Sequence, residues 1–112
     1  MSLIAEGRVV MIGPIRQELL SGIRRKEHFR LLREHLRAFP DFELAVEDFE
    51  EAADCFNRCR ARGVQGSNTD FLLCALCLRH GLSIFTTDAD FHHFNRVLGL
   101  RLHRPRPGEI DR

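Results

Sequence analysis

Four acidic side chains in this sequence occupy positions where an α/β fold would gather them: Glu18, Asp70, Asp88 and Asp90. Each follows a predicted strand or lies near the start of a predicted helix, and parallel α/β sheets bind their ligands at the carboxyl ends of the strands. Carboxylates that are brought together repel one another unless cations neutralise them, and their hard oxygen atoms suit Mg²⁺ or Mn²⁺. Such an ion can generate a nucleophilic water and stabilise a leaving oxygen, which is the chemistry of phosphodiester hydrolysis.

Each of these acids also has a purely structural interpretation. Asp70 and Asp88 are suitable helix N-terminal residues, and Asp90 could interact with the helix dipole in a first turn. Glu18 could be a surface residue paired with nearby arginines. Asp70 is the strongest candidate for a metal ligand, because the helix that it opens has almost no other polar residue before Arg79.

The elements that would position these acids alternate between strands and helices along the chain. This alternation is typical of a parallel sheet with helical crossovers, and we predict one α/β domain over residues 1–112 with an extended tail at 104–112. The predicted strands are Arg8–Ile12, Phe42–Val46, Leu82–Phe85 and Leu100–His103. The predicted helices run from Pro14 to about Arg25, from Phe29 to Phe39, from Val46 to Gly63, from Asp70 to His80 and from Phe91 to Gly99.

The composition is that of an ordinary globular domain, with 44% hydrophobic and 29% charged residues. Disordered and membrane-spanning classes are excluded, and the absence of a signal pattern predicts a cytoplasmic protein. The basic residues are sixteen arginines and one lysine. Arginine forms bidentate contacts with phosphate, so the helix-borne arginines are candidates for binding RNA phosphates, or alternatively lie on solvated helix faces. These candidates are Arg16, Arg24, Arg25 and Arg30.

Pairs of cysteine and histidine residues could in principle bind a metal ion, but their spacing in this sequence does not favour a metal site. Cys55/Cys59 and Cys74/Cys77 lie within apolar helical patterns, which predicts buried free thiols rather than a metal or redox centre. His92 and His93 are adjacent on a helix and diverge by about 100°, so we expect both on the surface rather than around one ion.

Three motifs together resemble the PIN domain, the nuclease fold of VapC-type toxins: Gly7–Gly22, Ser67–Ala75 and Ser83–Phe91. The resemblance implies a three-layer α/β/α fold with a mostly parallel sheet. It places Glu18, Asp70 and Asp88 on the acidic catalytic and metal-binding positions of the family. It also implies an additional metal ligand at Asp90, supporting polar residues at Thr86 and Asn68, and Mg²⁺ or Mn²⁺ as the cofactor.

One departure from the family pattern concerns the start of the chain. PIN domains begin with a central strand ending in an aspartate, and no such segment precedes Arg8–Ile12. We therefore expect an N-terminally truncated domain whose first central strand, between Arg8–Ile12 and Leu82–Phe85, is absent. A missing ligand predicts a weak or inactive nuclease. Unpaired strand edges predict a homodimer, either strand-mediated or domain-swapped.

The resemblance implies a metal-dependent endoribonuclease acting on RNA, the toxin of a toxin–antitoxin pair, with an antitoxin helix bound to the segment Pro14–Phe39. The alternative is a non-catalytic PIN-like module that binds RNA or protein. An unrelated flavodoxin-like domain with an acidic Mg²⁺ pocket is disfavoured, because it needs an acidic pair after the first strand and a lysine after a late strand. The single lysine, Lys26, lies in the predominantly helical segment Pro14–Phe39 and does not follow a late strand.

Overall fold

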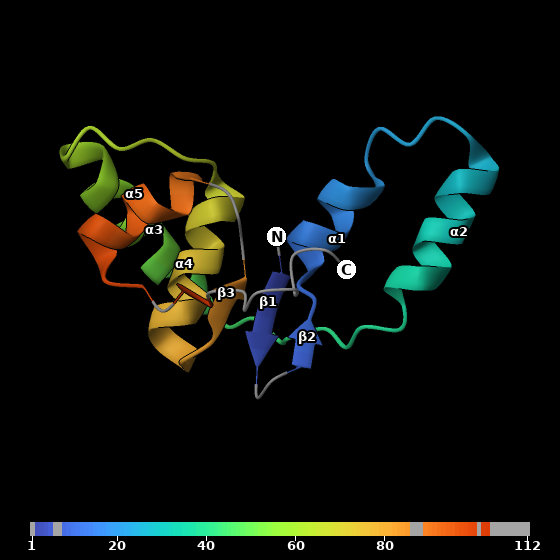
Figure 1. Ribbon diagram of the computed structural model, residues 1–112, viewed down its shortest axis with the longest axis horizontal. Helices are drawn as coiled ribbons and strands as arrows, with labels where there is room; N and C mark the ends of the chain where they lie inside the picture. Colours follow the sequence, from blue (N-terminus) through green and yellow to red (C-terminus); the bar gives the residue numbers. More distant parts are fainter. Residues whose placement is uncertain (1, 6–7, 86–88, 101, 104–112) are drawn as a thin grey trace.

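A computed structural model describes residues 2–5, 8–85, 89–100 and 102–103 of the chain. Strands and helices follow one another as an α/β arrangement, and Figure 1 shows the sheet between two groups of helices. The strands are β1 (Ser2–Ala5), β2 (Arg8–Val10), β3 (Ser83–Phe85) and β4 (Leu102–His103). The helices are α1 (Gly13–Leu20), α2 (Lys26–Leu36), α3 (Val46–Ala61), α4 (Asn68–His80) and α5 (Ala89–Leu98).

The four strands pair in the order β2-β1-β3-β4. β1 is antiparallel to both β2 and β3, and β3 and β4 are parallel. The sheet is therefore mixed, and the expectation of mostly parallel pairing was wrong. The three strands that the sequence predicted here, β2, β3 and β4, nevertheless all run in one direction, because β2 and β3 are each antiparallel to β1.

β1 occupies the position between β2 and β3 that was expected to be empty. Leu3 is paired with Val10 on one side and with Ile84 on the other. The amide and carbonyl groups of two neighbouring strands need hydrogen-bond partners, and β1 supplies them on the facing edges of both. The prediction that the facing edges of β2 and β3 are unpaired was therefore wrong. β1 lies between them and runs antiparallel to both.

The segment Phe42–Val46 is not a strand. Phe42 N–H donates to the carbonyl oxygen of Met11 at 2.7 Å, and Met11 N–H donates to that of Pro40 at 2.9 Å, which forms an isolated bridge between Met11 and Asp41. The strand pairing extends no further because the residues after Phe42 lead into helix α3. The Asp48 carboxylate accepts the N–H of Ala45 at 2.8 Å, so the chain turns into α3.

The helices lie close to their predicted positions. α1 ends at Leu20 rather than near Arg25, and Gly22 follows it with a positive φ of 85°, a conformation that favours glycine. α4 is buried along Phe71–Cys77, as its continuous apolar sequence predicted. α4 packs against α3 and lies beside β3, and with α5 these elements enclose the core.

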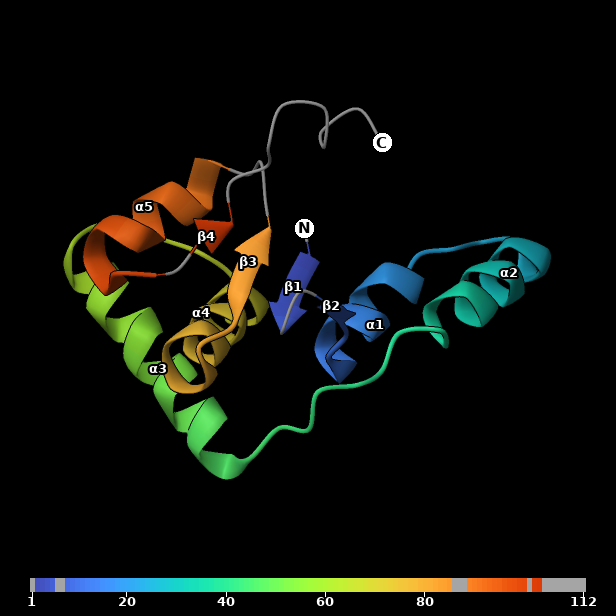
Figure 2. The same cartoon turned by 60° about the horizontal axis from the view of Figure 1, so that its bottom comes forward.

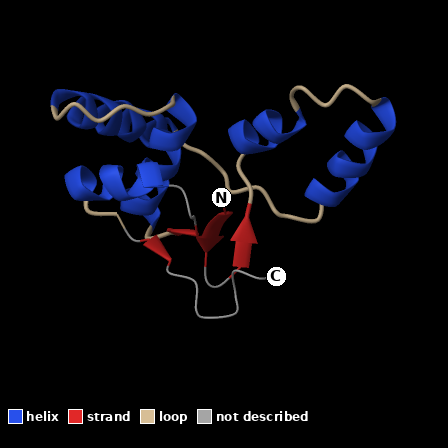
Figure 3. Cartoon of the chain, turned by 45° about the horizontal axis from the view of Figure 1, so that its top comes forward, coloured by secondary structure: helices blue, strands red, loops and turns tan. Residues whose placement is uncertain are grey.

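α1 and α2 form a helical arm, defined here as residues Gly13–Phe39, that extends away from α3, α4 and α5. Figures 2 and 3 show this separation from two further directions. α1 contains no fully buried residue, and the buried residue of α2 is Leu36. Within the described ranges, no helix is long and apolar enough to span a membrane.

Candidate functional site

Asp70, the strongest of the candidate ligands, holds the first turn of α4. Its Oδ2 accepts the N–H of Ser67 at 3.0 Å, and its own N–H donates to the Ser67 hydroxyl oxygen at 3.1 Å. This reciprocal pair is a capping box, so the structural interpretation of Asp70 is confirmed. Asp70 remains partly exposed at the surface.

Glu18 and Asp90 lie exposed on two other helices that begin at the same end of the sheet. α1 follows the carboxyl end of β2 and α5 follows that of β3, and these two strands run in the same direction. α4 precedes β3, so its last turn lies at the opposite end of the sheet. Its first turn therefore lies toward the end where α5 begins (Figure 1). The helices that carry Glu18 and Asp90 therefore begin at one end of the sheet, and the first turn of α4, with Asp70, lies toward the same end.

The acids do not form a complete metal centre among the residues that the structure describes. No group of three histidine, cysteine, aspartate or glutamate side chains lies close enough there to hold an ion. Asp88 and Thr86 lie outside the described residues. The donor type suits Mg²⁺ or Mn²⁺, because carboxylate oxygens are hard ligands, but the described side chains alone do not supply the coordination shell.

A groove of about 460 Å³ lies beside the start of α4. α3 forms one wall with apolar side chains that include Phe49 and Phe56, and Pro14 of α1 contributes from the arm. Asn68, predicted as a supporting residue, is exposed and lines the groove from the start of α4, next to Thr69. The groove is thus largely apolar, with amide and hydroxyl groups where it approaches Asp70.

The arginines predicted to contact RNA phosphates differ in their surroundings. Arg16 donates from Nη2 to Asp41 at 2.6 Å and to the carbonyl oxygen of Phe39 at 3.3 Å, so its guanidinium ties the two ends of the helical arm together. Arg24, Arg25 and Arg30 are exposed. These three side chains are accessible to a charged partner, whereas Arg16 has a structural role.

Two further arginines of the helical arm, Arg33 and Arg37, are partly neutralised by Glu34. Glu34 lies 3.5 Å from Arg33 and 3.8 Å from Arg37. Such exposed pairs contribute little to stability, but they show that this part of the arm carries charges of both signs.

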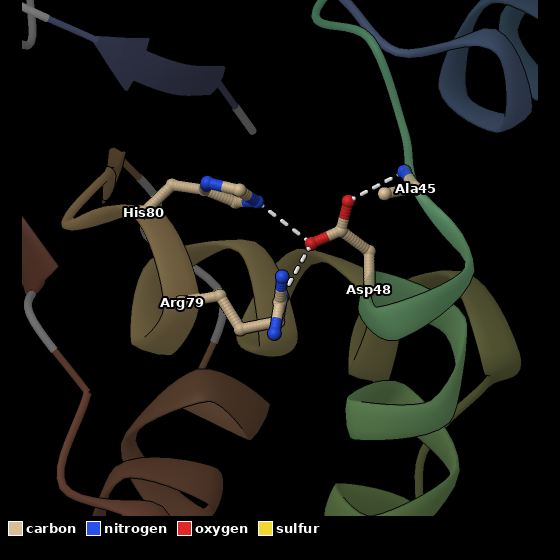
Figure 4. A network of polar contacts seen from close by, with 4 residues as sticks. All are labelled: Ala45, Asp48, Arg79 and His80. Carbon is tan, nitrogen blue, oxygen red and sulfur yellow. Dashed lines mark hydrogen bonds and ion pairs between the residues drawn. The ribbon is translucent and has the colours of Figure 1, made fainter.

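Asp48 is a fully buried carboxylate that the sequence analysis did not single out. Its exposed fraction is 0%. Oδ1 accepts from Nε of Arg79 at 2.8 Å and lies 2.7 Å from Nε2 of His80, and Oδ2 accepts the Ala45 N–H (Figure 4). An ionised carboxylate only accepts hydrogen bonds, so His80 Nε2 carries the proton in this contact.

The pKa of Asp48 lies below the usual range of an aspartate. Burial disfavours the charged form and by itself would raise the pKa. The hydrogen bonds from Ala45, His80 and Arg79 act in the opposite direction and outweigh burial. Asp48 is therefore ionised at neutral pH, and its charge is matched by the basic end of α4.

A sequence signal for this network existed. Acidic residues cluster at the start of α3, where carboxylates suit the helix dipole, and the Asp48 carboxylate accepts the N-cap amide there. Arg79 and His80 lie at the end of α4, where basic side chains suit the dipole in the same way. Only the packing of α3 against α4 shows that Asp48 is their partner.

The four cysteines are free and buried, as predicted. Burial raises the pKa of Cys55 to about 11 and that of Cys77 to about 12, and it raises the pKa values of Cys59 and Cys74 as well. These thiols are therefore unreactive core groups.

His92 and His93 are both exposed, which agrees with their predicted surface placement. His93 Nδ1 contacts Arg96 on the same helix.

The sequence matches the family model of the PIN domain over residues 1–97. The chain belongs to the PIN domain family. Membership implies an α/β fold, which the structure has, and a nuclease-like or RNA-related function, and PIN domains generally use divalent metal ions. No curated protein matches this chain.

Proposed function

We propose that this protein is a metal-dependent endoribonuclease that hydrolyses RNA phosphodiester bonds. The observation that carries the proposal is the family match together with the placement of Glu18, Asp70 and Asp90 on helices that meet one end of the sheet. Asp88, in the connection between β3 and α5, is proposed as a further ligand of the same site.

Mg²⁺ or Mn²⁺ bound by these carboxylates would supply an activated water and neutralise charge on the leaving oxygen. The protein's own contribution is to fix the direction of the acids. The capping box with Ser67 holds the Asp70 side chain against the first turn of α4. The exposed arginines Arg24, Arg25 and Arg30 are proposed to attract the RNA backbone.

The test is cleavage of single-stranded RNA with Mg²⁺ or Mn²⁺ and with a chelator. We expect metal-dependent cleavage, and a loss of at least about a hundredfold in rate for Asp70→Asn and for Glu18→Gln, the scale on which removal of one electrostatic stabiliser acts. Ser67→Ala is the matched control at Asp70, because it removes the cap but keeps the carboxylate. Glu34→Gln is the control for Glu18.

Two results would reject this function. Cleavage that persists in the chelator would exclude a metal mechanism, and unchanged cleavage by Asp70→Asn would exclude this site. RNA binding without any cleavage would favour the alternative, a non-catalytic PIN-like module. The exposed apolar side chains of the helical arm, such as Leu19 and Leu31, favour a protein-binding role for such a module.

A toxin role is proposed from the same activity, with an antitoxin protein as the partner that restrains it. Inducible expression of the chain would arrest growth, and expression of Asp70→Asn at the same level would not. Growth arrest by both would show that toxicity does not come from RNA cleavage.

A further inference from the structure

The groove beside the start of α4 is shaped by the order of large and small side chains along α3. Phe49 and Phe56 are seven residues apart, which places them on one face of the helix, about two turns or about 10 Å apart along its axis. The small side chains of Ala52 and Ala53 line the groove between them. α3 therefore contributes two aromatic rings separated by a floor of alanines, and this difference in size leaves the hollow of about 460 Å³.

The two rings differ in how firmly they are held. Phe56 is half-buried and meets the buried ring of Phe71 edge-on, with centroids 5.4 Å apart, and the guanidinium of Arg60 lies 5.8 Å from the centroid of Phe56. Phe49 is 52% exposed. The ring of Phe56 is thus fixed in position by its neighbours, whereas Phe49 offers apolar surface that a ligand would remove from water.

The polar groups of the groove come from both helices. Asn57 lies on α3, and Asn68 and Thr69 begin α4. None of the described residues that line the groove is charged. A side-chain amide has an acceptor oxygen and two donor hydrogens, so it pairs with the edge of an uncharged ring that carries both donors and acceptors. The groove therefore suits a flat, uncharged heterocycle better than a phosphate group.

The groove adjoins the acidic residue that the proposed mechanism uses. Asn68 and Thr69 directly precede Asp70 in the first turn of α4. An RNA strand that brings a phosphate to Asp70 would therefore carry a neighbouring base to the groove. Proteins recognise single-stranded RNA by stacking its bases on aromatic side chains and by hydrogen bonds to the base edges, and both kinds of group are present here.

We propose that the groove binds one unpaired adenine of the RNA substrate, an inference that rests on the proposed function and adds the base that the site selects. Phe56 would give the base a fixed ring to stack on, and Asn57 and Asn68 would pair with its edge. Asparagine matches N6 and N7 of adenine, whereas guanine is matched by arginine or lysine and cytosine by a carboxylate. The volume lies within the range of about 300–1,000 Å³ that is typical of small-ligand pockets.

The test measures RNA binding instead of cleavage. Fluorescence anisotropy gives the dissociation constants of labelled pentamers of adenylate, uridylate, cytidylate and abasic nucleotides in a chelator. All four pentamers carry the same phosphates, so differences in affinity report on the bases. Because the measurement needs no cleavage, base selection is scored separately from the nuclease activity.

Two variants alter the groove, and each has a matched control outside it. Ala53→Leu fills the hollow, and because Ala53 is exposed and leucine is a good helix former, α3 should be retained. Its control is Ala61→Leu, at the exposed last residue of α3. Asn57→Ala removes one amide from the groove, and Gln17→Ala removes an exposed amide from α1.

We expect the adenylate pentamer to bind at least about tenfold more tightly than the abasic pentamer, the scale of one stacked base, and more tightly than the other two pentamers. Ala53→Leu should abolish this advantage, and Asn57→Ala should reduce the preference for adenylate over uridylate. Both controls should behave like the parent. The abasic pentamer should bind all five proteins equally, because the contacts to phosphates are unchanged.

Equal binding of the adenylate and abasic pentamers would overturn the proposal, since phosphates alone would then account for the affinity. Tighter binding of uridylate or cytidylate, or an adenylate advantage that survives in Ala53→Leu, would also overturn it. Cleavage of RNA without any base selection would reject this role of the groove and leave the proposed function standing, whereas adenylate selection without cleavage would do the reverse. Loss of a protein partner by Ala53→Leu, with RNA binding unchanged, would assign the groove to that protein.

Discussion

Asp48 and His80 are joined by a 2.7 Å contact between a carboxylate oxygen of the fully buried Asp48 and Nε2 of His80, whose side chain is 30% exposed. This contact links the beginning of α3 to the end of α4, the two helices that pack together in the core. His80 also meets the ring of Phe42 edge-on, with centroids 4.9 Å apart. The backbone N–H of Phe42 donates to the carbonyl oxygen of Met11, which lies just before the helical arm, so these contacts connect the arm to α4.

Replacement of Asp48 by asparagine will lower the free energy of unfolding by about 1–3 kcal/mol, because one neutral amide cannot accept all three hydrogen bonds. The loss stays within this range because Arg79 and His80 are 35% and 30% exposed and can bind water instead. Urea unfolding at neutral pH measures the change.

Asp54→Asn is the matched control for this experiment, because Asp54 is an exposed acid whose ion pair with Arg58 is 3.8 Å long. Loss of this ion pair should lower the free energy of unfolding by less than about 0.5 kcal/mol. Equal effects of the two substitutions would show that the buried network adds nothing beyond an ordinary surface pair.

The contribution of Asp48 will disappear in acid. The folded protein holds the pKa of Asp48 below its ordinary value, so the unfolded chain binds a proton at higher pH than the folded chain does. The stabilisation is therefore complete above about pH 5 and is lost as the pH falls through the folded pKa, below about pH 4.

This acid dependence is measured as the difference in unfolding free energy between the parent and Asp48→Asn across the pH range. The difference should be constant near neutrality and shrink below about pH 4. A difference that changed mainly between about pH 5 and pH 7 would assign the effect to a group other than this carboxylate.

Substitution of Gly66 by alanine will destabilise the fold by about 1–3 kcal/mol through overpacking. A Cβ at this position would lie 2.6 Å from Cζ of Phe94 and 3.1 Å from Cε2 of Phe71, both of which are buried. Gly13→Ala is the control, because a Cβ there meets nothing within 4 Å. Thermal unfolding compares the two, and equal melting temperatures would show that the rings move aside without cost.

The four thiols will react slowly with iodoacetamide in the native protein near pH 8. Their pKa values are raised by burial, to about 11 for Cys55 and about 12 for Cys77, and the thiolate is the reactive form. Mass spectrometry should find four modified cysteines after unfolding in urea and few before it. Rapid modification of any one of them in the native state would contradict its burial.

The sequence predicted most elements because their signals are local. The apolar run of α4 depends on residues close to one another, and the structure confirms it. The Ser67 cap and the left-handed Gly81 at the end of the helix are local features of the same kind. The prediction of a strand at Phe42–Val46 was wrong because a local signal for the start of a helix lies next to it. Its alternating pattern is compatible with a strand, but the buried carboxylate of Asp48 binds the Ala45 amide and starts a helix instead.

The sequence by itself determined the α/β class and the PIN family motifs, and it supplied the acidic residues that are candidates for the site. Tertiary structure alone decided the direction of β1, the pairing of Asp48 with Arg79 and His80, and the exposure of the helical arm. Periodicity and capping report on neighbours along the chain. Strand pairing, burial of a charge and the covering of an apolar face depend on residues that are distant in sequence, and only the folded chain brings them together.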